Sequence, residues 1–270
     1  MEAVEKINQK LWAHKSIADE YRKTTDLHAA ERAIADELAA QRTFRAVLDI
    51  GIGAGRTVTP LSRLGKSYIG LDYSQTMIDL ARQQHPEHDL RCMDARDLSD
   101  FADNSFDLVW FSFNGIDCVA HDDRLRILAE VRRVLADDGL FVFSSHNRDA
   151  ARVPAHDLRN LRRSRNPLRM IRHIGGYVVK NINARRLKRQ ETHAADYAIV
   201  NDAAHRYGLL LYYISPRAQI RQLAQAGLRV ERMVGLDGAP VDPDTARDHI
   251  WVHYICCPTG ETAATKDART

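Results

Sequence analysis

The chain has 270 residues, of which 44% are hydrophobic and 28% charged, and it carries a formal net charge of +3 at pH 7. These values are ordinary for a globular protein with one large α/β domain or two small ones, and they exclude a chain that is disordered throughout. The first residues include acids and no apolar secretion signal, and no later apolar run approaches the ~20 residues of a membrane span. We therefore expect a cytoplasmic protein.

The four cysteines predict neither a metal site nor a disulfide framework. Cys92, Cys118, Cys256 and Cys257 include no C-x-x-C pair, and the last two are adjacent. We expect all four thiols to be reduced, and we expect no bound metal.

The first 44 residues predict a helical cap, because apolar residues within 2–41 recur at helical spacing. Five strands are predicted next, and they alternate with helices that end near Leu64, before Pro86 and at the turn Asp137-Asp138-Gly139. These strands lie at about 45–50, 67–71, 89–93, 105–113 and 140–143. The alternation predicts an α/β fold with a doubly wound, mostly parallel sheet that binds its ligand at the carboxyl ends of the strands.

A basic segment interrupts this alternation after the fifth strand. Residues 151–191 hold twelve Lys or Arg and two acids, so their net charge is 12 − 2 = +10 and the remainder of the chain carries 3 − 10 = −7. A helix that starts at Ser215-Pro216 follows, and then two closing strands at about 228–236 and 249–256. We expect 258–270 to form a flexible tail.

The motif most informative about function lies between the first strand and the next helix. It is Asp49-Ile50-Gly51-Ile52-Gly53-Ala54-Gly55, in which an acid at the end of the strand is followed by a turn with alternate glycines. Such a turn lets backbone N–H groups approach a nucleotide. In the G-x-G-x-x-G motif of dinucleotide oxidoreductases the third glycine comes one position later, where this chain has Arg56. The spacing therefore disfavours NAD.

With this motif, residues 45–145 resemble the class I S-adenosylmethionine-dependent methyltransferases, whose first motif is an acid followed by G-x-G-x-G. The resemblance implies a seven-stranded sheet in the order 3-2-1-4-5-7-6 with strand 7 antiparallel, formed by 45–257. It also implies that 148–207 is a substrate-lid insertion after strand 5. The cofactor would be S-adenosyl-L-methionine, and S-adenosyl-L-homocysteine would be its product.

The same resemblance implies roles for individual cofactor residues. Asp72, at the end of strand 2, would accept hydrogen bonds from both ribose hydroxyls, because a carboxylate offers two acceptor oxygens to a vicinal diol. Asp94, after strand 3, would accept from the adenine amine with the Ala95 N–H as its companion, and Met77 would lie under the adenine. The complete expected cofactor site consists of Asp49, Gly51, Gly53, Gly55, Asp72, Tyr73, Met77, Asp94, Ala95 and Phe111.

We expect the methyl acceptor to bind where loops follow strands 4 and 5. Methyl transfer from a sulfonium is an in-line displacement, so the protein contributes mainly alignment and the exclusion of water, and a hydroxyl acceptor additionally needs a base. His146 is the expected base, since its ordinary pKa lies near working pH, and Tyr21 of the cap is a second catalytic candidate. The candidate substrate-binding residues are Asn114, Asn147, Tyr212 and Tyr213.

The loops at 112–115 and 145–149 are similar to those of glycine N-methyltransferase and related small-molecule N-methyltransferases. In those enzymes the asparagine after strand 5 helps to hold the substrate carboxylate, and Asn147 occupies that position here. This second resemblance implies a small-molecule acceptor.

The basic segment leaves four roles open. It could form a lid over an anionic or polar small substrate, or a solvated or intersubunit face. A membrane-surface element would use its interleaved leucines, although Pro167 would break a helix there. An RNA-binding face would need stacking aromatics, and Tyr177 is the only aromatic residue between Asn147 and Tyr197.

We therefore expect a methyltransferase that acts on a nitrogen or oxygen of a small polar or anionic metabolite. The alternatives are a methyltransferase that acts on RNA or a membrane lipid through the basic segment, and a non-catalytic S-adenosylmethionine-binding protein. The sequence decides neither the accepting atom nor the oligomeric state.

Overall fold

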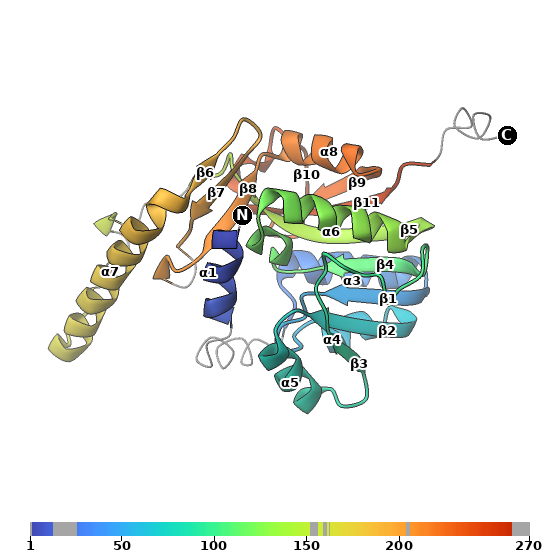
Figure 1. Cartoon of the computed structure of the whole chain (residues 1–270), viewed down its shortest axis with the longest axis horizontal. Coiled ribbons are helices and arrows are strands. Elements are labelled where there is room, and N and C mark those ends of the chain that lie inside the picture. The colour runs from blue at the N-terminus through green and yellow to red at the C-terminus, as the bar shows by residue number, and fades with distance from the viewer. Residues whose placement is uncertain are drawn as a thin grey trace.

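The structure is a computed structural model, and it describes residues 2–12, 26–151, 156–158, 161, 163–203 and 206–260. Its centre is one eleven-stranded sheet whose main path runs β10-β9-β11-β5-β4-β1-β2-β3 (Figure 1). The strands of this path are β1 (Phe44–Ile50), β2 (Gly65–Asp72), β3 (Asp89–Cys92), β4 (Phe106–Phe111), β5 (Leu135–Asn147), β9 (Leu228–Val234), β10 (Pro240–Val241) and β11 (Trp251–Pro258).

The predicted order of seven strands is confirmed along this path. β3-β2-β1-β4-β5-β11-β9 corresponds to 3-2-1-4-5-7-6, and β11 runs antiparallel to both β5 and β9. All six residues of β4 are buried, as its unbroken apolar run predicts for a central strand. The strand count differs, because four further strands join these seven.

Three of the additional strands come from the insertion and its end. They are β6 (Thr192–His193), β7 (Tyr197–Asn201) and β8 (Leu210–Ile214). β8 pairs in parallel with β5 through His146 and Asn147, beyond Phe143, the last β5 residue that pairs with β4. β7 and β6 then continue antiparallel. The insertion therefore extends the sheet at the carboxyl end of β5.

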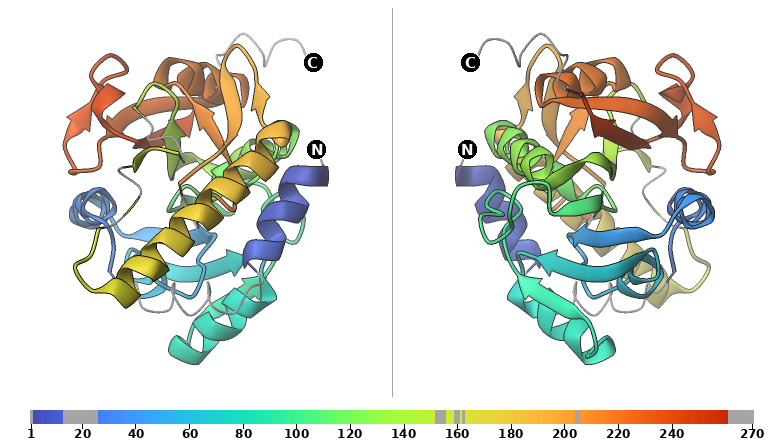
Figure 2. Two further views of the ribbon diagram at one scale, coloured as in Figure 1. Left: turned by 90° about the vertical axis from the view of Figure 1, so that its left-hand side faces the viewer. Right: turned by 90° about the vertical axis from the view of Figure 1, so that its right-hand side faces the viewer.

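Helices cover both faces of the sheet. They are α3 (Ala29–Gln41), α4 (Val58–Ser62), α5 (Gln75–Gln84), α6 (His121–Val134) and α8 (Pro216–Gln225). α6 and α8 bury Leu128 and Leu223 in the larger core cluster, whereas α3 and α4 bury Leu38 and Leu61 in a second one. Figure 2 shows these layers from both sides.

Two helices lie outside this sandwich. α1 (Glu2–Trp12) stands at the carboxyl ends of the strands, and α7 (Pro167–Leu187) projects from the body of the protein with its first residues outermost (Figures 1 and 2). Among the described residues, none of the helices combines the length and the apolar composition of a membrane span.

Two boundaries differ from the sequence predictions. The turn expected at Asp137-Asp138-Gly139 lies inside β5, because α6 already ends at Val134 and Leu135 pairs with Phe106. Pro167 does not break a helix but begins one, because the Asn166 side chain caps α7 by accepting from Arg169 N at 3.1 Å, and a first-turn proline removes no intrahelical bond.

Candidate functional site

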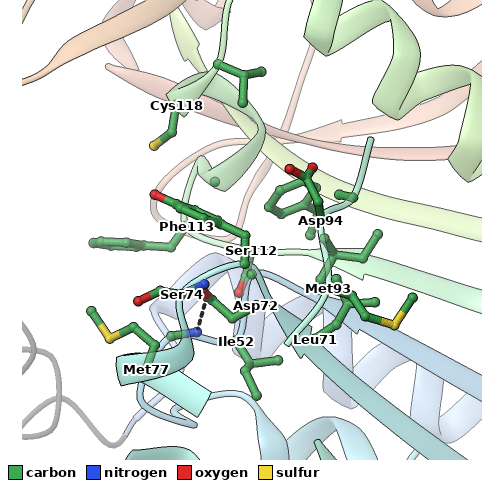
Figure 3. A pocket seen from close by; sticks show the side chains of 18 of the residues that line it. Ile52, Leu71, Asp72, Ser74, Met77, Met93, Asp94, Ser112, Phe113 and Cys118 are labelled. Atoms are coloured by element: carbon green, nitrogen blue, oxygen red, sulfur yellow. Dashed lines mark hydrogen bonds between the residues drawn. The ribbon is translucent and has the colours of Figure 1, made fainter. Parts of the chain in front are cut away.

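A pocket opens at the carboxyl ends of β1, β2, β3 and β4, where the sequence places its polar turns (Figure 3). Eight of the ten expected cofactor residues line it, and α1 contributes to its wall. These eight are Gly51, Gly53, Asp72, Tyr73, Met77, Asp94, Ala95 and Phe111. A doubly wound sheet binds its ligands at this edge.

The glycine turn after β1 needs its glycines for two different reasons. Gly51, Gly53 and Gly55 have φ of +71°, +54° and +99°, a left-handed conformation that favours glycine. A Cβ on Gly51 would lie 2.7 Å from Cε2 of Phe111, whereas a Cβ on Gly53 would meet nothing within 4 Å. Gly53 therefore presents bare backbone to free space, as close approach by a ligand requires.

Asp72 lies at the rim of this turn, at the end of β2. Its Oδ2 accepts from Gly53 N at 2.9 Å and its Oδ1 accepts from Ser74 N at 2.8 Å. Burial raises the pKa of this carboxyl to about 6, although both backbone bonds oppose that shift. Each oxygen keeps a second lone pair, so the carboxylate is oriented and can still accept hydrogen bonds from a diol.

Asp49 lies behind the glycine turn rather than in the pocket. It is fully buried, and its Oδ2 accepts from Thr57 Oγ1 at 2.5 Å and from the Tyr68 hydroxyl at 2.8 Å. Burial raises its pKa to about 7, and its Oδ1 has no hydrogen-bond partner among the described residues. Gly55 is also absent from the lining, and a Cβ there would meet His85. These two residues support the loop from the protein side.

Asp94 is held by a neighbour that also fixes α1. Arg96 places Nε 3.0 Å from Oδ1 of Asp94 and Nη2 2.5 Å from its Oδ2, and the same Nη2 lies 2.6 Å from Glu5 of α1. The hydrogen bond from Arg96 lowers the pKa of Glu5. Asn8 ties α1 down further by donating to Cys118 O and Leu210 O. α1 therefore covers one side of the pocket.

The loop after β4 carries a feature that the sequence does not reveal. Phe113 and Asn114 both have left-handed φ, +53° and +56°, which costs a non-glycine residue about 1–3 kcal/mol and recurs at functional sites. This kink leaves the Phe113 ring 38% exposed in the wall of the pocket. The ring stacks on His28 at 5.0 Å and meets Trp251 edge-on at 6.0 Å. No motif marks these three aromatic residues as neighbours.

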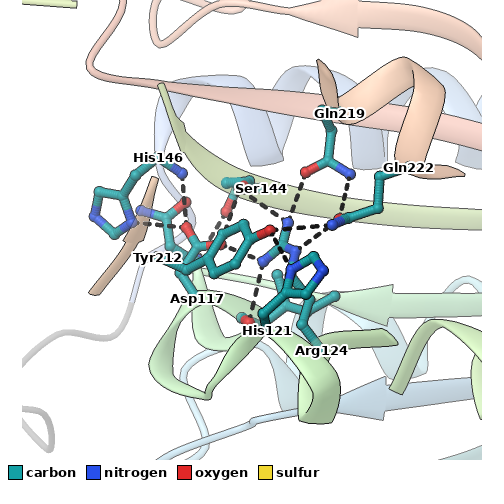
Figure 4. A network of polar contacts seen from close by, with 11 residues as sticks. Asp117, His121, Arg124, Ser144, His146, Tyr212, Gln219 and Gln222 are labelled. Atoms are coloured by element: carbon teal, nitrogen blue, oxygen red, sulfur yellow. Dashed lines mark hydrogen bonds and ion pairs between the residues drawn. The ribbon is translucent and has the colours of Figure 1, made fainter. Parts of the chain in front are cut away.

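Asp117 is the centre of a buried polar network beside the pocket (Figure 4). It lies in the short helix η1 (Gly115–Cys118), and its Oδ1 pairs with Arg124 Nη1 at 2.5 Å. Its Oδ2 accepts from His146 N at 2.6 Å and lies 2.7 Å from His146 Nδ1. Arg124 also donates to Gln219 and Gln222 of α8, so the network joins η1, α6, β5 and α8. Sequence reasoning missed both Asp117 and Arg124.

The structure places the expected acceptor residues outside the lining of this pocket. Asn147 donates to Ala246 O and His249 O, and the Tyr212 hydroxyl contacts His121 and Gln222, so these polar groups serve the fold. Burial raises the pKa of Tyr212 to about 12. The Tyr213 hydroxyl donates to Asp202. Asn114 and His146 lie beside the pocket wall without lining it, and Tyr21 lies outside the described residues.

The donors and acceptors around the pocket suit a nucleoside-bearing ligand. Its wall combines a glycine with open space beside it, a carboxylate fixed by two N–H groups and apolar side chains such as Met77. In the part of the chain that the structure describes, no group of three His, Cys, Asp or Glu side chains is placed to hold a metal ion.

A family profile described as a methyltransferase domain matches residues 48–143. The biotin biosynthesis bifunctional protein BioHC of Cellvibrio japonicus is 41% identical over 105 residues, which are 38% of this chain and 20% of that protein. The demethylmenaquinone methyltransferase of Renibacterium salmoninarum is 36% identical over 96 residues, which are 36% of this chain and 39% of that protein. The chain thus spans well under half the length of these two relatives.

Solved structures extend the likeness of fold to nearly the whole chain. A DhpI complex with S-adenosylhomocysteine (SAH) superposes with a TM-score of 0.58 and 16% identity, covering 97% of this chain and 100% of that one. At this identity the likeness shows the fold alone.

Proposed function

We propose that this chain, whose residues 48–143 match a methyltransferase domain, transfers the methyl group of S-adenosylmethionine to a small molecule. The accepting atom would be a nitrogen or oxygen of a polar or anionic metabolite in the cytoplasm. The S–CH₃ bond breaks, its electron pair stays on sulfur, and the acceptor's lone pair forms the new bond to carbon. An N–H or O–H acceptor also releases a proton.

One observation carries this proposal: a buried carboxylate, pinned by backbone N–H groups, stands beside a glycine with free space above it. Asp72 would accept from the ribose hydroxyls, and Gly53 would let the ligand approach the backbone. Asp94 would meet the adenine amine with its orientation set by Arg96. Asp49 would act through the loop, as a positioning residue.

We assign the methyl acceptor to the aromatic side chains of Phe113, His28 and Trp251, which together are called the aromatic wall. Phe113 lines the pocket and contacts the other two, so an acceptor held there would be aligned and shielded from water. Two relatives named for biotin biosynthesis and for demethylmenaquinone support a small-molecule acceptor.

A base is needed only for a hydroxyl acceptor, and His146 remains its predicted source. With Nδ1 donating to Asp117, the neutral ring carries its lone pair on Nε2. Trp251 lies edge-on to both His146 and Phe113, at 6.1 and 6.0 Å between ring centroids, which brings this imidazole next to the aromatic wall.

Calorimetric titration with S-adenosylmethionine tests the binding half of the proposal. Asp72→Asn keeps the shape and removes the charge, and we expect about 100-fold weaker binding, because two charge-assisted hydrogen bonds lose about 1–1.5 kcal/mol each when the acceptor becomes neutral. Asp79→Asn is the matched control, since Asp79 is an exposed acid of α5. Equal affinity in wild type and Asp72→Asn would remove the ribose assignment.

Formation of S-adenosylhomocysteine tests the catalytic half. We expect turnover with one class of small amine, phenol or carboxylate, and Phe113→Ala should reduce it more than it reduces cofactor affinity. Tight cofactor binding without product from any such class would instead favour the non-catalytic alternative.

A further inference from the structure

The helix α7 carries an apolar stripe that the protein leaves exposed. Only Leu187 of its 21 residues is buried. Between 168 and 182 six large hydrophobic residues are 41–78% exposed. These residues are Leu168, Ile171, Ile174, Val178, Val179 and Ile182.

The exposed residues form one continuous face. At about 100° per residue they fall, with Gly175, in an arc about 140° wide that contains no polar residue from 168 to 182. An apolar arc of this width is typical of a helix that buries one face against another apolar surface. The body of the protein contacts α7 elsewhere, since Tyr177 donates to His156 O and Asn183 to Arg206 O.

The positive charge of α7 favours an anionic partner. α7 contains five basic residues and no acid, and residues 158–190 contain no acid either. Among the described residues none of these five forms an ion pair. Arg172 adjoins the stripe, and Arg169 and Lys180 lie on the polar side of the helix. A helix with one apolar face and a cationic polar side matches a surface that is anionic outside and apolar beneath.

We propose that α7 docks on an anionic lipid bilayer, lying in the interface with its apolar stripe toward the acyl chains. Its first residues project away from the sheet at one end of the molecule, so a planar surface can reach them (Figure 1). The docking surface is independent of methyl transfer and does not require the acceptor to be a lipid.

Two other partners for the α7 stripe, a second copy of this chain and RNA, fit less well than a bilayer. A second copy would bring ten α7 cations together without an acid to offset them, which costs free energy. RNA would need stacking partners, yet Tyr177 is the only aromatic residue of α7 and its hydroxyl is bound within the chain.

The end of α7 is anchored to the cap of the pocket. Leu187 packs in one cluster with Val4 of α1, and a second hollow lies between Ile7 of α1 and Asn183 of α7. At about 100° per residue Leu187 lies on the side of α7 opposite to the stripe, so this anchoring to α1 leaves the stripe free to meet a bilayer.

Co-sedimentation of the full chain with phosphatidylcholine vesicles, with and without phosphatidylglycerol, tests this docking. We expect binding only with phosphatidylglycerol, and its loss in high salt. Arg169→Gln with Arg172→Gln should lower the partition coefficient about 30-fold, because each cation near such a surface contributes about 1 kcal/mol. Ile171→Ser with Ile182→Ser should lower it at least about 10-fold.

Matched controls use exposed residues of the core domain. Arg63→Gln with Lys66→Gln removes two cations elsewhere, and Leu125→Ser removes an apolar side chain of α6 that is 38% exposed. Both should bind vesicles like the wild type, and circular dichroism should show every variant folded. Absence of vesicle binding, equal loss in the controls, concentration-dependent dimers or retention on RNA alone would each overturn the proposal. None of these outcomes depends on cofactor binding.

Discussion

The helices α6 and α7 are both amphipathic and both end in a pair of arginines, yet they meet different surroundings. α6 buries Ile127, Leu128 and Val131 against the sheet and places Arg124 in a closed polar network. α7 buries only Leu187 and leaves its stripe and its cations outside. The same sequence pattern thus serves the core in one helix and, by our proposal, an external surface in the other.

The largest predicted effect breaks the buried ion pair that fixes α6. Asp117→Ala should lower the free energy of unfolding by about 3–5 kcal/mol, because it leaves the fully buried Arg124 guanidinium without its carboxylate. Urea denaturation measures this change. Asp244→Ala, which removes an exposed pair with Arg217, is the control and should leave the stability close to that of the wild type. Equal effects of the two substitutions would contradict the importance of the Asp117 network.

The next largest effect compares how much the apolar faces of α6 and α7 contribute to the free energy of unfolding. Leu128→Ala in α6 should destabilise the protein by about 3 kcal/mol, because the side chain is completely buried and its removal leaves a cavity. Ile182→Ala in α7 should change stability by less than about 0.5 kcal/mol, since this side chain is 58% exposed. A loss at Ile182 as large as that at Leu128 would mean that the stripe packs within the protein.

Much of the fold follows from local patterns in the sequence. The strand order and the glycine turn were predictable because apolar runs, turn glycines and strand-end acids are short-range signals. The acceptor side was not, because its contacts join distant residues: Phe113 contacts His28 and Trp251, which are 113 − 28 = 85 and 251 − 113 = 138 positions away. The left-handed φ of Phe113 is likewise set by packing around the loop, not by its residue type.

The role of α7 shows a different limit of sequence reasoning. Helical periodicity predicts an apolar face but does not tell whether the face meets the core, a membrane or solvent. Pro167 added to the ambiguity, because a proline ends a helix in its interior and starts one at its first turn. Only the placement of the helix in space separates these cases.

The smallest effect is a pH dependence that separates the pocket from α7. Burial raises the pKa of Asp72 to about 6, and the ribose hydroxyls need the ionised carboxylate as acceptor. Cofactor affinity should therefore be constant well above pH 6 and fall as pH drops through 6, reaching about a ten-fold loss one unit below. Arginine stays charged over this range, so vesicle binding through α7 should not weaken.

Calorimetry gives the pH profile of cofactor affinity and co-sedimentation gives that of vesicle binding, both between pH 5 and 8. Asp72→Asn should flatten the cofactor profile and leave the vesicle profile unchanged. A cofactor profile that keeps its slope in this variant would assign the titration to another group, with Asp49 and its pKa of about 7 the first to examine by Asp49→Asn.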